Sequence, residues 1–203
     1  MKARFIAIEG LDGSGGTTQT RALADLLRAR GTPTHITREP SDGPIGQLIR
    51  RALRNSEPLS EAVLPYLFAA DRRDHLDRII LPRLDAGTWV ISDRYLASSL
   101  AYQSIVATFD RVVELNRDYP MPDLTVQLDL SPETCMARIA ARGAPRERFE
   151  NLDRLRAISR GYDAALTWTE KQGGKVVRID ASWPVPAVTQ AIREALDSAS
   201  FRF

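Results

Sequence analysis

The sequence contains a single cysteine, Cys135, so no disulfide can form within the chain. Cys135 stands at helical spacing from Ile139, which is typical of a small buried side chain. No apolar run approaches the ~18 residues of a membrane span. The short apolar run at residues 5–8 leads into a glycine-rich turn, which is not the layout of a signal peptide. These absences predict a cytoplasmic protein with no membrane partner.

Lysine is also scarce, because 25 of the 28 basic residues are arginine. The lysines are Lys2, Lys171 and Lys175, none of them near the glycine-rich turn. A GC-rich genome accounts for such an excess of arginine without a functional cause, although arginine is also suited to bidentate contacts with phosphate. The net charge of +2 is too small to indicate binding to nucleic acid, and we expect no such partner.

A length of 203 residues suits one domain, and we expect residues 1–203 to form it. Apolar runs typical of buried parallel strands occupy residues 3–9, 34–37, 88–92, 124–130 and 175–179. Helical patterns lie between them, at residues 17–30, 45–54, 60–85, 96–106, 110–119, from 131 onward, 149–172 and 184–196. Irregularities are expected at Pro65 and Pro82, and an interruption at Gly161. The alternation predicts an α/β fold, a five-stranded parallel sheet with helices on both faces.

Residues 10–17 have the pattern of a phosphate-binding loop (P-loop), with Gly10 and Gly15 at its first and sixth positions and Thr17 at its eighth. Backbone N–H groups and a helix N-terminus would hold nucleotide phosphates there, and Thr17 is a candidate ligand of Mg²⁺. A structural turn is the alternative, but four glycines in seven residues argue against it. The predicted ATP-binding residues are Gly10, Gly13, Ser14, Gly15, Gly16, Thr17 and Thr18. Gly16 stands where such loops normally carry lysine.

Three further motifs occur at residues 37–40 (Thr-Arg-Glu-Pro), 68–72 (Phe-Ala-Ala-Asp-Arg) and 93–103, which begins Asp-Arg-Tyr and ends Ala-Tyr-Gln. Glu9, Arg38 and Asp93 each come at the end of an apolar run. Because ligands bind at the carboxyl ends of parallel strands, we expect all three to approach one crevice. Taken singly, each has a simpler explanation as a solvated charge or a local ion pair.

The four motifs, in this order and spacing, resemble the thymidylate kinases, which belong to the P-loop nucleoside monophosphate kinases. The resemblance covers roughly residues 4–196 and includes Pro122-Asp123-Leu124 and the segment 178–182. The block at 93–103 is the most specific, since it separates this family from its relatives. The resemblance implies a P-loop NTPase fold with a short lid. It also implies phosphoryl transfer from ATP to dTMP for dTTP synthesis, with Mg²⁺ and in a homodimer.

The resemblance further implies roles for individual residues in holding dTMP. Phe68 would stack on thymine and Arg72 would donate a hydrogen bond to it, while Ser99 and Gln103 would read the edge of the base. Tyr102 would lie against the sugar. The whole implied dTMP-binding set is Asp12 at the 3′-hydroxyl, Arg38 and Arg94 at the phosphate, with Phe68, Arg72, Ser99, Tyr102 and Gln103 at the nucleoside. Asp93 would join Thr17 in binding the metal.

The segment at about 142–150 corresponds by resemblance to a mobile lid over ATP, and its arginines are candidates to neutralise the transferring group. Arg142 and Arg148 are favoured for this, whereas Arg146 is left open. With Asp93 and Arg94 they form the implied catalytic set. One branch of the family places such an arginine in the P-loop, directly after the aspartate, but this chain has Gly13 there and so resembles the branch that uses the lid.

Departures from the family pattern are few. Ser41-Asp42 replaces a usual pair of glycines, Gln47 a glutamate and Ser104 a glycine, and these concern loop details. Gly16 has a larger consequence, because phosphoryl transfer depends mostly on positioning and charge. By analogy with deleting one preorganised donor, its loss could cost about 3–4 kcal/mol, or roughly a hundred- to a thousandfold in rate.

Three interpretations of Gly16 compete. In the first interpretation, the chain is a working kinase in which an arginine, most plausibly one from the lid, replaces the missing charge. In the second interpretation, the chain is a nucleotide-binding relative with little activity. In the third, Gly16 is a variant change in an ordinary enzyme. A kinase for another nucleoside monophosphate is a further alternative. The motifs for dTMP look complete, which favours the working thymidylate kinase.

Overall fold

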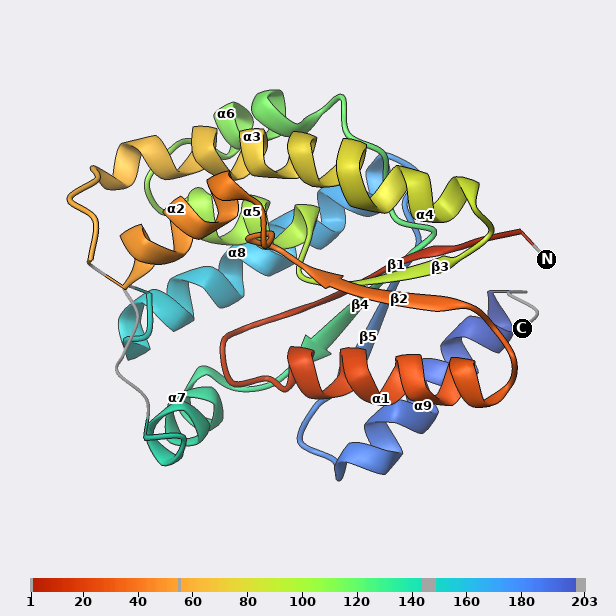
Figure 1. Ribbon diagram of the computed structural model, residues 1–203. Coiled ribbons are helices and arrows are strands. Elements are labelled where there is room, and N and C mark those ends of the chain that lie inside the picture. The colour runs from red at the N-terminus through yellow and green to blue at the C-terminus, as the bar shows by residue number, and fades with distance from the viewer. Residues whose placement is uncertain (1, 55, 144–148, 200–203) are drawn as a thin grey trace.

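The computed structural model describes residues 2–54, 56–143 and 149–199. A five-stranded, fully parallel sheet lies at its centre, in the order β2-β3-β1-β4-β5 (Figure 1). The strands are β1 (Phe5–Gly10), β2 (Thr34–Arg38), β3 (Trp89–Asp93), β4 (Leu124–Asp129) and β5 (Val176–Asp180). The predicted α/β architecture is confirmed.

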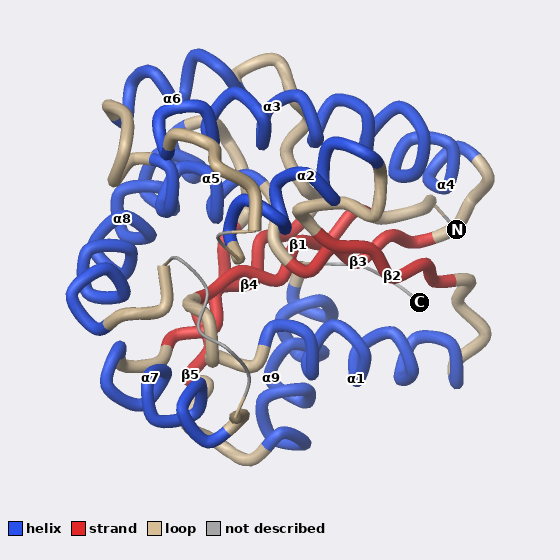
Figure 2. The backbone as a smooth tube through the Cα atoms, turned by 60° about the vertical axis from the view of Figure 1, so that its left-hand side comes forward, coloured by secondary structure: helices blue, strands red, loops and turns tan. Residues whose placement is uncertain are grey.

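Helices cover both faces of the sheet (Figures 1 and 2). One face carries α1 (Gly16–Ala29) and α9 (Val185–Ser198). The opposite face carries α2 (Pro44–Leu53), η1 (Glu61–Val63), α3 (Leu64–His75), η2 (Leu76–Ile80), α4 (Leu81–Asp85), α5 (Leu96–Gln103), α6 (Phe109–Asn116) and α8 (Leu152–Lys171). The short α7 (Pro132–Ala141) lies beside the carboxyl ends of the strands. Within the described ranges, no helix combines the length and the apolar character needed to cross a bilayer.

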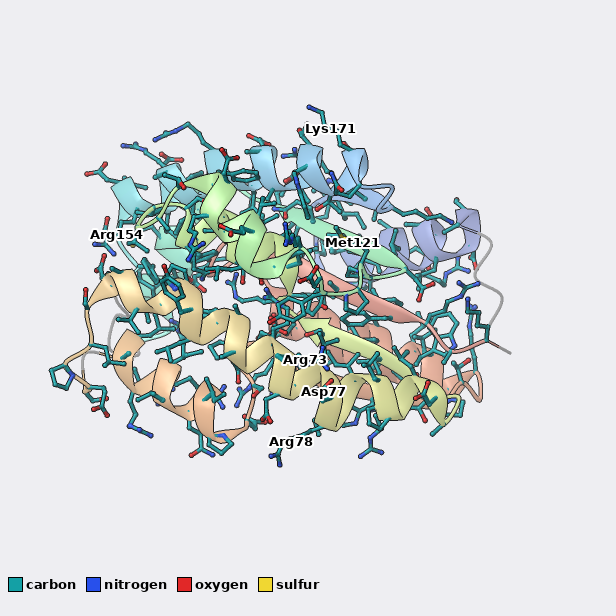
Figure 3. All side chains as sticks on the ribbon, turned by 90° about the horizontal axis from the view of Figure 1, so that it is seen from above. Arg73, Asp77, Arg78, Met121, Arg154 and Lys171 are labelled. Atoms are coloured by element: carbon teal, nitrogen blue, oxygen red, sulfur yellow. The ribbon has the colours of Figure 1, made fainter. Side chains whose placement is uncertain are left out.

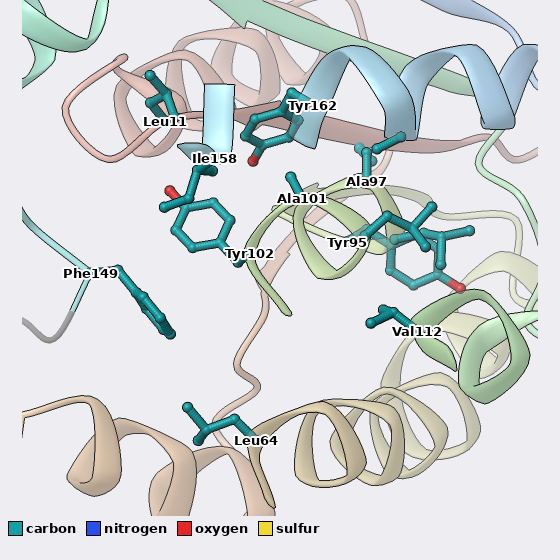
Figure 4. Close-up of a cluster of buried hydrophobic side chains, with 14 of the residues drawn as sticks. Leu11, Leu64, Tyr95, Ala97, Ala101, Tyr102, Val112, Phe149, Ile158 and Tyr162 are labelled. Atoms are coloured by element: carbon teal, nitrogen blue, oxygen red, sulfur yellow. The ribbon is translucent and has the colours of Figure 1, made fainter. Parts of the chain in front are cut away.

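The alternation of side chains along β1 divides the core into two layers. Phe5 and Ala7 belong to a cluster beneath α5 and α8, part of which Figure 4 shows. Ile6 and Ile8 belong to the other cluster, beneath α1 and α9. Successive side chains of a strand point to opposite faces, so a strand covered on both sides must be apolar throughout. This explains the continuous apolar run that precedes the glycine loop.

The long helical stretch predicted for residues 60–85 is present, and its irregularity lies where Pro82 places it. After α3 the chain forms one wider π turn, η2, in which the Leu81 N–H donates to the Leu76 carbonyl. In a regular α-helix the ring of Pro82 would press on the carbonyl of Arg78, and proline has no N–H to donate. The wider turn avoids this conflict. Pro65 lies in the first turn of α3, where the lost N–H costs nothing.

The predicted interruption at Gly161 is wrong, because α8 runs without a break through this residue. A Cβ atom at Gly161 would lie 2.8 Å from the carbonyl oxygen of Ala101 on α5. The glycine therefore allows the two helices to approach closely, and it serves packing instead of ending the helix. The start of α8 also differs, since Asn151 caps it by accepting from the Arg154 N–H at 3.0 Å.

We expect Gly161→Ala to destabilise the fold by about 1–3 kcal/mol, measured by urea denaturation. In an open helical position the same change usually stabilises, because alanine has the higher helix propensity. Ala164→Ser, at an exposed position of α8, is the control and should change stability by less than about 0.5 kcal/mol. An unchanged or raised stability of Gly161→Ala would contradict the close approach of the two helices.

Candidate active site

The glycine loop joins β1 to α1, and two of its glycines are required by the backbone conformation or by a close contact. Gly13 has a positive φ of 87°, and a Cβ there would lie 2.7 Å from the Cys135 carbonyl oxygen of α7. Gly15, with φ of 102°, stands at the N-cap of α1 and gives that helix no side-chain cap. The first N–H groups of α1 are therefore free of a side-chain cap, as an anion-binding helix N-terminus requires.

A cavity of about 530 Å³ lies over this loop. Residues 8–19 form its floor, so every predicted ATP-binding residue lines it. Asp93 and the arginines Arg94, Arg138 and Arg142 contribute charge to it, and Trp183 lies on its wall. Since the cavity combines uncapped helix N–H groups with three guanidinium groups, it suits a polyanion such as a nucleoside triphosphate.

A second cavity, of about 110 Å³, adjoins the first. Seven of the eight predicted dTMP-binding residues line it, namely Asp12, Phe68, Arg72, Arg94, Ser99, Tyr102 and Gln103. The Oε1 atom of Gln103 is buried and has no hydrogen-bond partner among the described residues. A buried acceptor without a partner is costly, so this atom indicates a ligand that donates a hydrogen bond to it.

Sequence reasoning missed Leu53 and Phe149 in the second cavity. Phe149 contacts Tyr102 edge to face, with 5.9 Å between ring centroids (Figure 4). Leu53 comes from α2, which no motif marked. The signal that could have found Phe149 is its place just after the lid arginines, as a large apolar residue in a charged segment.

The two cavities meet at Arg94. Its Nη1 donates to the Gly10 carbonyl at 2.8 Å, to Tyr162 Oη at 3.1 Å and to Ser98 Oγ at 3.2 Å, while Nη2 pairs with Asp12 at 2.7 Å. Arg94 has a φ of 72°, which is strained for any residue other than glycine. Strained backbone persists where the surrounding contacts hold it, and it gathers at functional sites. The arginine is thus fixed between the glycine loop and the second cavity.

Tyr102 completes this junction. Its hydroxyl donates to Asp12 Oδ2 and accepts from the Asp12 N–H, both at 3.1 Å, and the Arg94 guanidinium lies 4.8 Å from its ring centre. Burial raises the pKa of Tyr102 well above its usual value, with Asp12 adding to the effect. Tyr102 therefore stays a neutral hydroxyl and holds the Asp12 carboxylate in place.

Arg72 lies in a fully buried network beside the second cavity. Its Nε donates to Glu39 at 3.0 Å, and its Nη2 donates to the Tyr95 carbonyl at 3.0 Å and to Ser99 Oγ at 2.8 Å. Burial works to lower the pKa of Arg72, but the Glu39 carboxylate more than offsets this and raises the pKa. His75 Nδ1 lies 3.3 Å from the other oxygen of Glu39. The charge on Arg72 is therefore held in one orientation.

Arg38 lies apart from the other residues predicted to bind dTMP. It does not line the second cavity but shares a neighbouring one, of about 180 Å³, with Thr17 and Asp93. Its guanidinium pairs with Asp42 at 2.7 Å, and the hydrogen bond from Arg38 lowers the pKa of that carboxyl. Asp42 stands where the family usually has glycine. Its carboxylate therefore pairs with an arginine that is predicted to bind phosphate. The role of Arg38 stays a prediction.

The two predicted metal ligands lie together, since Thr17 Oγ1 donates to Asp93 Oδ2. Both present hard oxygen atoms, which Mg²⁺ prefers, and it commonly takes its remaining ligands from phosphates and water. The donor set therefore fits Mg²⁺ bound with a nucleotide. No group of three acidic, histidine or cysteine side chains suited to a metal occurs in the part of the chain described.

Asp93 also lies against the position of the missing lysine. A Cβ atom at Gly16 would be 2.8 Å from Asp93 Oδ1, which is the far end of a flexible side chain. The first carbon of a side chain at residue 16 would thus require this carboxylate to move.

The lid prediction is only partly visible. Arg142 lines the first cavity, and its Nη2 donates to the buried carboxylate of Glu150. Arg146 and Arg148 lie outside the described residues. Sequence reasoning missed Arg138, which stands one helical turn before Arg142 and lines the same cavity.

Glu9 lines the first cavity, as predicted, but its carboxylate is occupied by hydrogen bonds within the fold. It accepts from the N–H groups of Tyr95, Ala97 and Ser98 and from the Ser98 hydroxyl, at the start of α5. Burial raises the pKa of Glu9, and the hydrogen bonds from Ser98 work against that shift. A carboxylate at a helix N-terminus is favourable, so Glu9 anchors the helix that carries Ser99, Tyr102 and Gln103.

Comparison with known proteins adds to this geometry. The family model described as "Thymidylate kinase" matches residues 8–192. A "Thymidylate kinase" of Alkalilimnicola ehrlichii is 36% identical over 210 residues, which cover 100% of this chain and 96% of the relative. A "Thymidylate kinase" of Synechococcus sp. is 39% identical, with 97% and 96% covered. A "Probable thymidylate kinase" of Pyrococcus horikoshii is 38% identical, with 80% and 82% covered.

We expect Glu39→Ala to destabilise the fold by about 3–5 kcal/mol, because it leaves the buried Arg72 charge without its partner. Asp77→Ala is the control, since the Arg73–Asp77 pair is exposed on the outer surface of the α3–η2 stretch (Figure 3). Removing it should cost less than about 1 kcal/mol. Urea denaturation at pH 7 measures both, and equal losses would count against the buried network.

Cys135 should be unreactive in the folded chain. Burial raises the pKa of its thiol to about 12, so at pH 8 only about one molecule in ten thousand carries the reactive thiolate. In urea the pKa returns to about 8.5 and the thiol becomes accessible. Labelling with a thiol-specific reagent at pH 8 should therefore be slow in the native chain and fast in urea, and comparable rates would contradict the buried packing of α7.

Proposed function

This chain belongs to the thymidylate kinase family, and we propose that it transfers the γ-phosphoryl group of ATP to dTMP, giving dTDP and ADP for dTTP synthesis. The observation that carries the proposal is the junction of two adjoining cavities at Asp12 and Arg94. One cavity has the phosphate loop as its floor. The other has aromatic rings, a fixed arginine and an unpartnered amide oxygen. A donor and an acceptor would thus meet at a shared cation.

In the acceptor cavity, the thymine ring stacks on Phe68, with Phe149 and Leu53 as further apolar walls. Gln103 Oε1 accepts a hydrogen bond from the N3–H of the base, which satisfies its buried acceptor. Arg72 donates to a carbonyl of the base, and Ser99 acts mainly through Arg72, whose hydrogen bond its hydroxyl accepts. This refines the predicted role of Ser99.

The sugar and the phosphate of dTMP lie toward the junction. Asp12 accepts from the 3′-hydroxyl, and Tyr102 holds that carboxylate and lies against the sugar. Arg94 donates to the acceptor phosphate from a position that its contacts with the loop fix. Arg38 reaches the same phosphate only by leaving Asp42, because the exposed pair holds it elsewhere.

In the donor cavity, the backbone N–H groups of the loop and the start of α1 hold the β- and γ-phosphates of ATP. Thr17 and Asp93 would hold Mg²⁺, which would supply positive charge to the phosphates of ATP. Arg142 adds positive charge to this cavity, and Arg148 keeps the role that the resemblance implies for it. The chain itself does little covalent chemistry, and its contribution is position and charge.

The transfer balances as a single displacement. A phosphate oxygen of dTMP forms the new bond to the γ-phosphorus, and the bond from that phosphorus to the β–γ bridging oxygen breaks. The bridging oxygen leaves on ADP with the electron pair. Arg94 lies at the junction, where it opposes the negative charge that would otherwise keep the two phosphates apart.

Two other functions stay open for test. A chain without the loop lysine could bind both nucleotides with little turnover, or it could act on another monophosphate. The acceptor cavity favours turnover of dTMP, because it contains the buried Gln103 Oε1, which has no hydrogen-bond partner among the described residues and can accept from a base. We further propose that residues 1–203 form one domain, with loop 10–17 and lid 142–150. We also propose that the chain works as a cytoplasmic homodimer that binds neither membranes nor nucleic acid.

The central test is a coupled assay of ADP release with ATP, Mg²⁺ and one of dTMP, dUMP, dCMP or AMP. We expect dTMP to be the best acceptor and dUMP a weaker one, because it lacks the methyl group that packs in the cavity. Preference for another monophosphate would reject the thymidylate assignment. Binding of dTMP without any turnover would favour the inactive relative.

Gly16→Lys tests whether the missing charge has been replaced. If an arginine supplies it, we expect the variant to gain less than about tenfold in kcat, whereas an unreplaced charge should give a gain of about a hundredfold or more. The contact that the new Cβ atom makes is with the Asp93 carboxylate, the end of a flexible side chain that can move aside. Thermal unfolding is the control, and an unchanged melting temperature would confirm that the loop keeps its fold.

A further inference from the structure

We propose that Arg138, from α7, supplies the positive charge that residue 16 lacks, next to the β- and γ-phosphates of the donor. This inference rests on the proposed phosphoryl transfer. It differs from the sequence prediction, which looked first to the lid. Arg138 lies before the lid, on a helix that the structure describes completely.

The packing of α7 against the loop brings Arg138 to the cavity. The Cys135 carbonyl lies so close to Gly13 that a Cβ there would be 2.7 Å from it. Arg138 and Arg142 follow Cys135 at three and seven residues, so all three share one stripe of the helix. The stripe that touches the glycine loop is therefore the one that carries both arginines. Gly13 is itself the condition for this contact, because a side chain there would push α7 away.

The partners of Arg138 distinguish it from the other cations of the cavity. Arg94 pairs with the Asp12 carboxylate at 2.7 Å, and Arg142 pairs with the buried carboxylate of Glu150. Among the described residues, the hydrogen bonds of Arg138 go to carbonyl oxygens, those of Gly13 at 3.5 Å and Ala181 at 3.2 Å. In the described part of the chain no carboxylate neutralises it. Its charge is therefore available to a phosphate.

The two carbonyl contacts are weak enough to be exchanged. The contact to Gly13 is at the limit of a hydrogen bond, and both acceptors are neutral. A phosphate oxygen carries negative charge, and arginine binds phosphate strongly and often through two parallel hydrogen bonds, so a phosphate competes well with these two neutral carbonyl oxygens. Arg138 is exposed on its helix, so its side chain can turn toward the loop without leaving a buried site. It lies on the loop at Gly13, three residues before the position that lacks lysine.

A double-mutant cycle between residues 138 and 16 tests the proposal. The four proteins are the unaltered chain, Arg138→Gln, Gly16→Lys and the double variant. Glutamine keeps hydrogen-bonding capacity and removes the charge. Single-turnover rates with saturating ATP and dTMP report the chemical step, free of product release. We expect Arg138→Gln to slow this step by about a hundredfold, and by less than about threefold when Gly16→Lys is also present.

Arg142→Gln, alone and with Gly16→Lys, is the matched control, because it removes the same charge from the same stripe one turn later. We expect Arg142→Gln to slow the single-turnover rate by a similar factor with and without Gly16→Lys. The proposal would be overturned if Arg138→Gln slowed the single-turnover rate equally with and without Gly16→Lys. It would also be overturned if Gly16→Lys restored the rate of Arg142→Gln and not that of Arg138→Gln. A rise in KM for ATP with an unchanged single-turnover rate would also overturn it, because Arg138 would then only bind the donor.

Two measurements separate other failures from this one. Titration of dTMP binding should give the same Kd for all four proteins, and Arg138→Gln should unfold at the same temperature as the unaltered chain. If Gly16→Lys does not phosphorylate dTMP either, the proposed function itself fails, and the inference with it. If Gly16→Lys is active and the cycle is additive, only the assignment of Arg138 fails.

Discussion

The site depends on the fixed guanidinium of Arg94. This side chain donates to the carbonyl of Gly10, at the first turn of the glycine loop, and pairs with Asp12 within the same loop. Its own backbone is held at a positive φ directly after β3. The loop, the end of β3 and the start of α5 are thereby joined at one cation. Because both cavities share this cation, their relative position is set before any ligand binds, which lowers the cost of aligning two phosphates.

Buried charge around this junction is arranged in pairs and with hydrogen bonds throughout. Glu9 satisfies the start of α5, and Glu39 satisfies Arg72. Such groups are expensive to bury, and replacing them with apolar residues often stabilises a protein. We infer that they are retained because they orient polar side chains toward the acceptor cavity. Stability and substrate recognition thus rest on the same contacts, and His75, at the other oxygen of Glu39, belongs to that set.

The loss of the loop lysine changes which elements must cooperate. A lysine at residue 16 would carry its charge on the loop itself, whereas an arginine on α7 depends on the packing of that helix against Gly13. The glycine at residue 13 and the glycine at residue 16 are then linked, since the first admits the helix that compensates for the second. The abundance of arginine alone would not explain this, because many of the described arginines are paired with carboxylates on the surface.

The sequence alone determined the fold class, the order of the strands along the chain and seven of the thirteen residues that line the second cavity. Apolar periodicity and glycine spacing are local signals, and the motifs at strand ends needed only the rule that parallel strands end at one edge. Tertiary structure decided the rest. Gly161 looked like a helix break because propensity is local, while its close contact with Ala101 comes from another helix. Phe149 and Arg138 entered the site for the same reason, since the packing of separate elements brings them there.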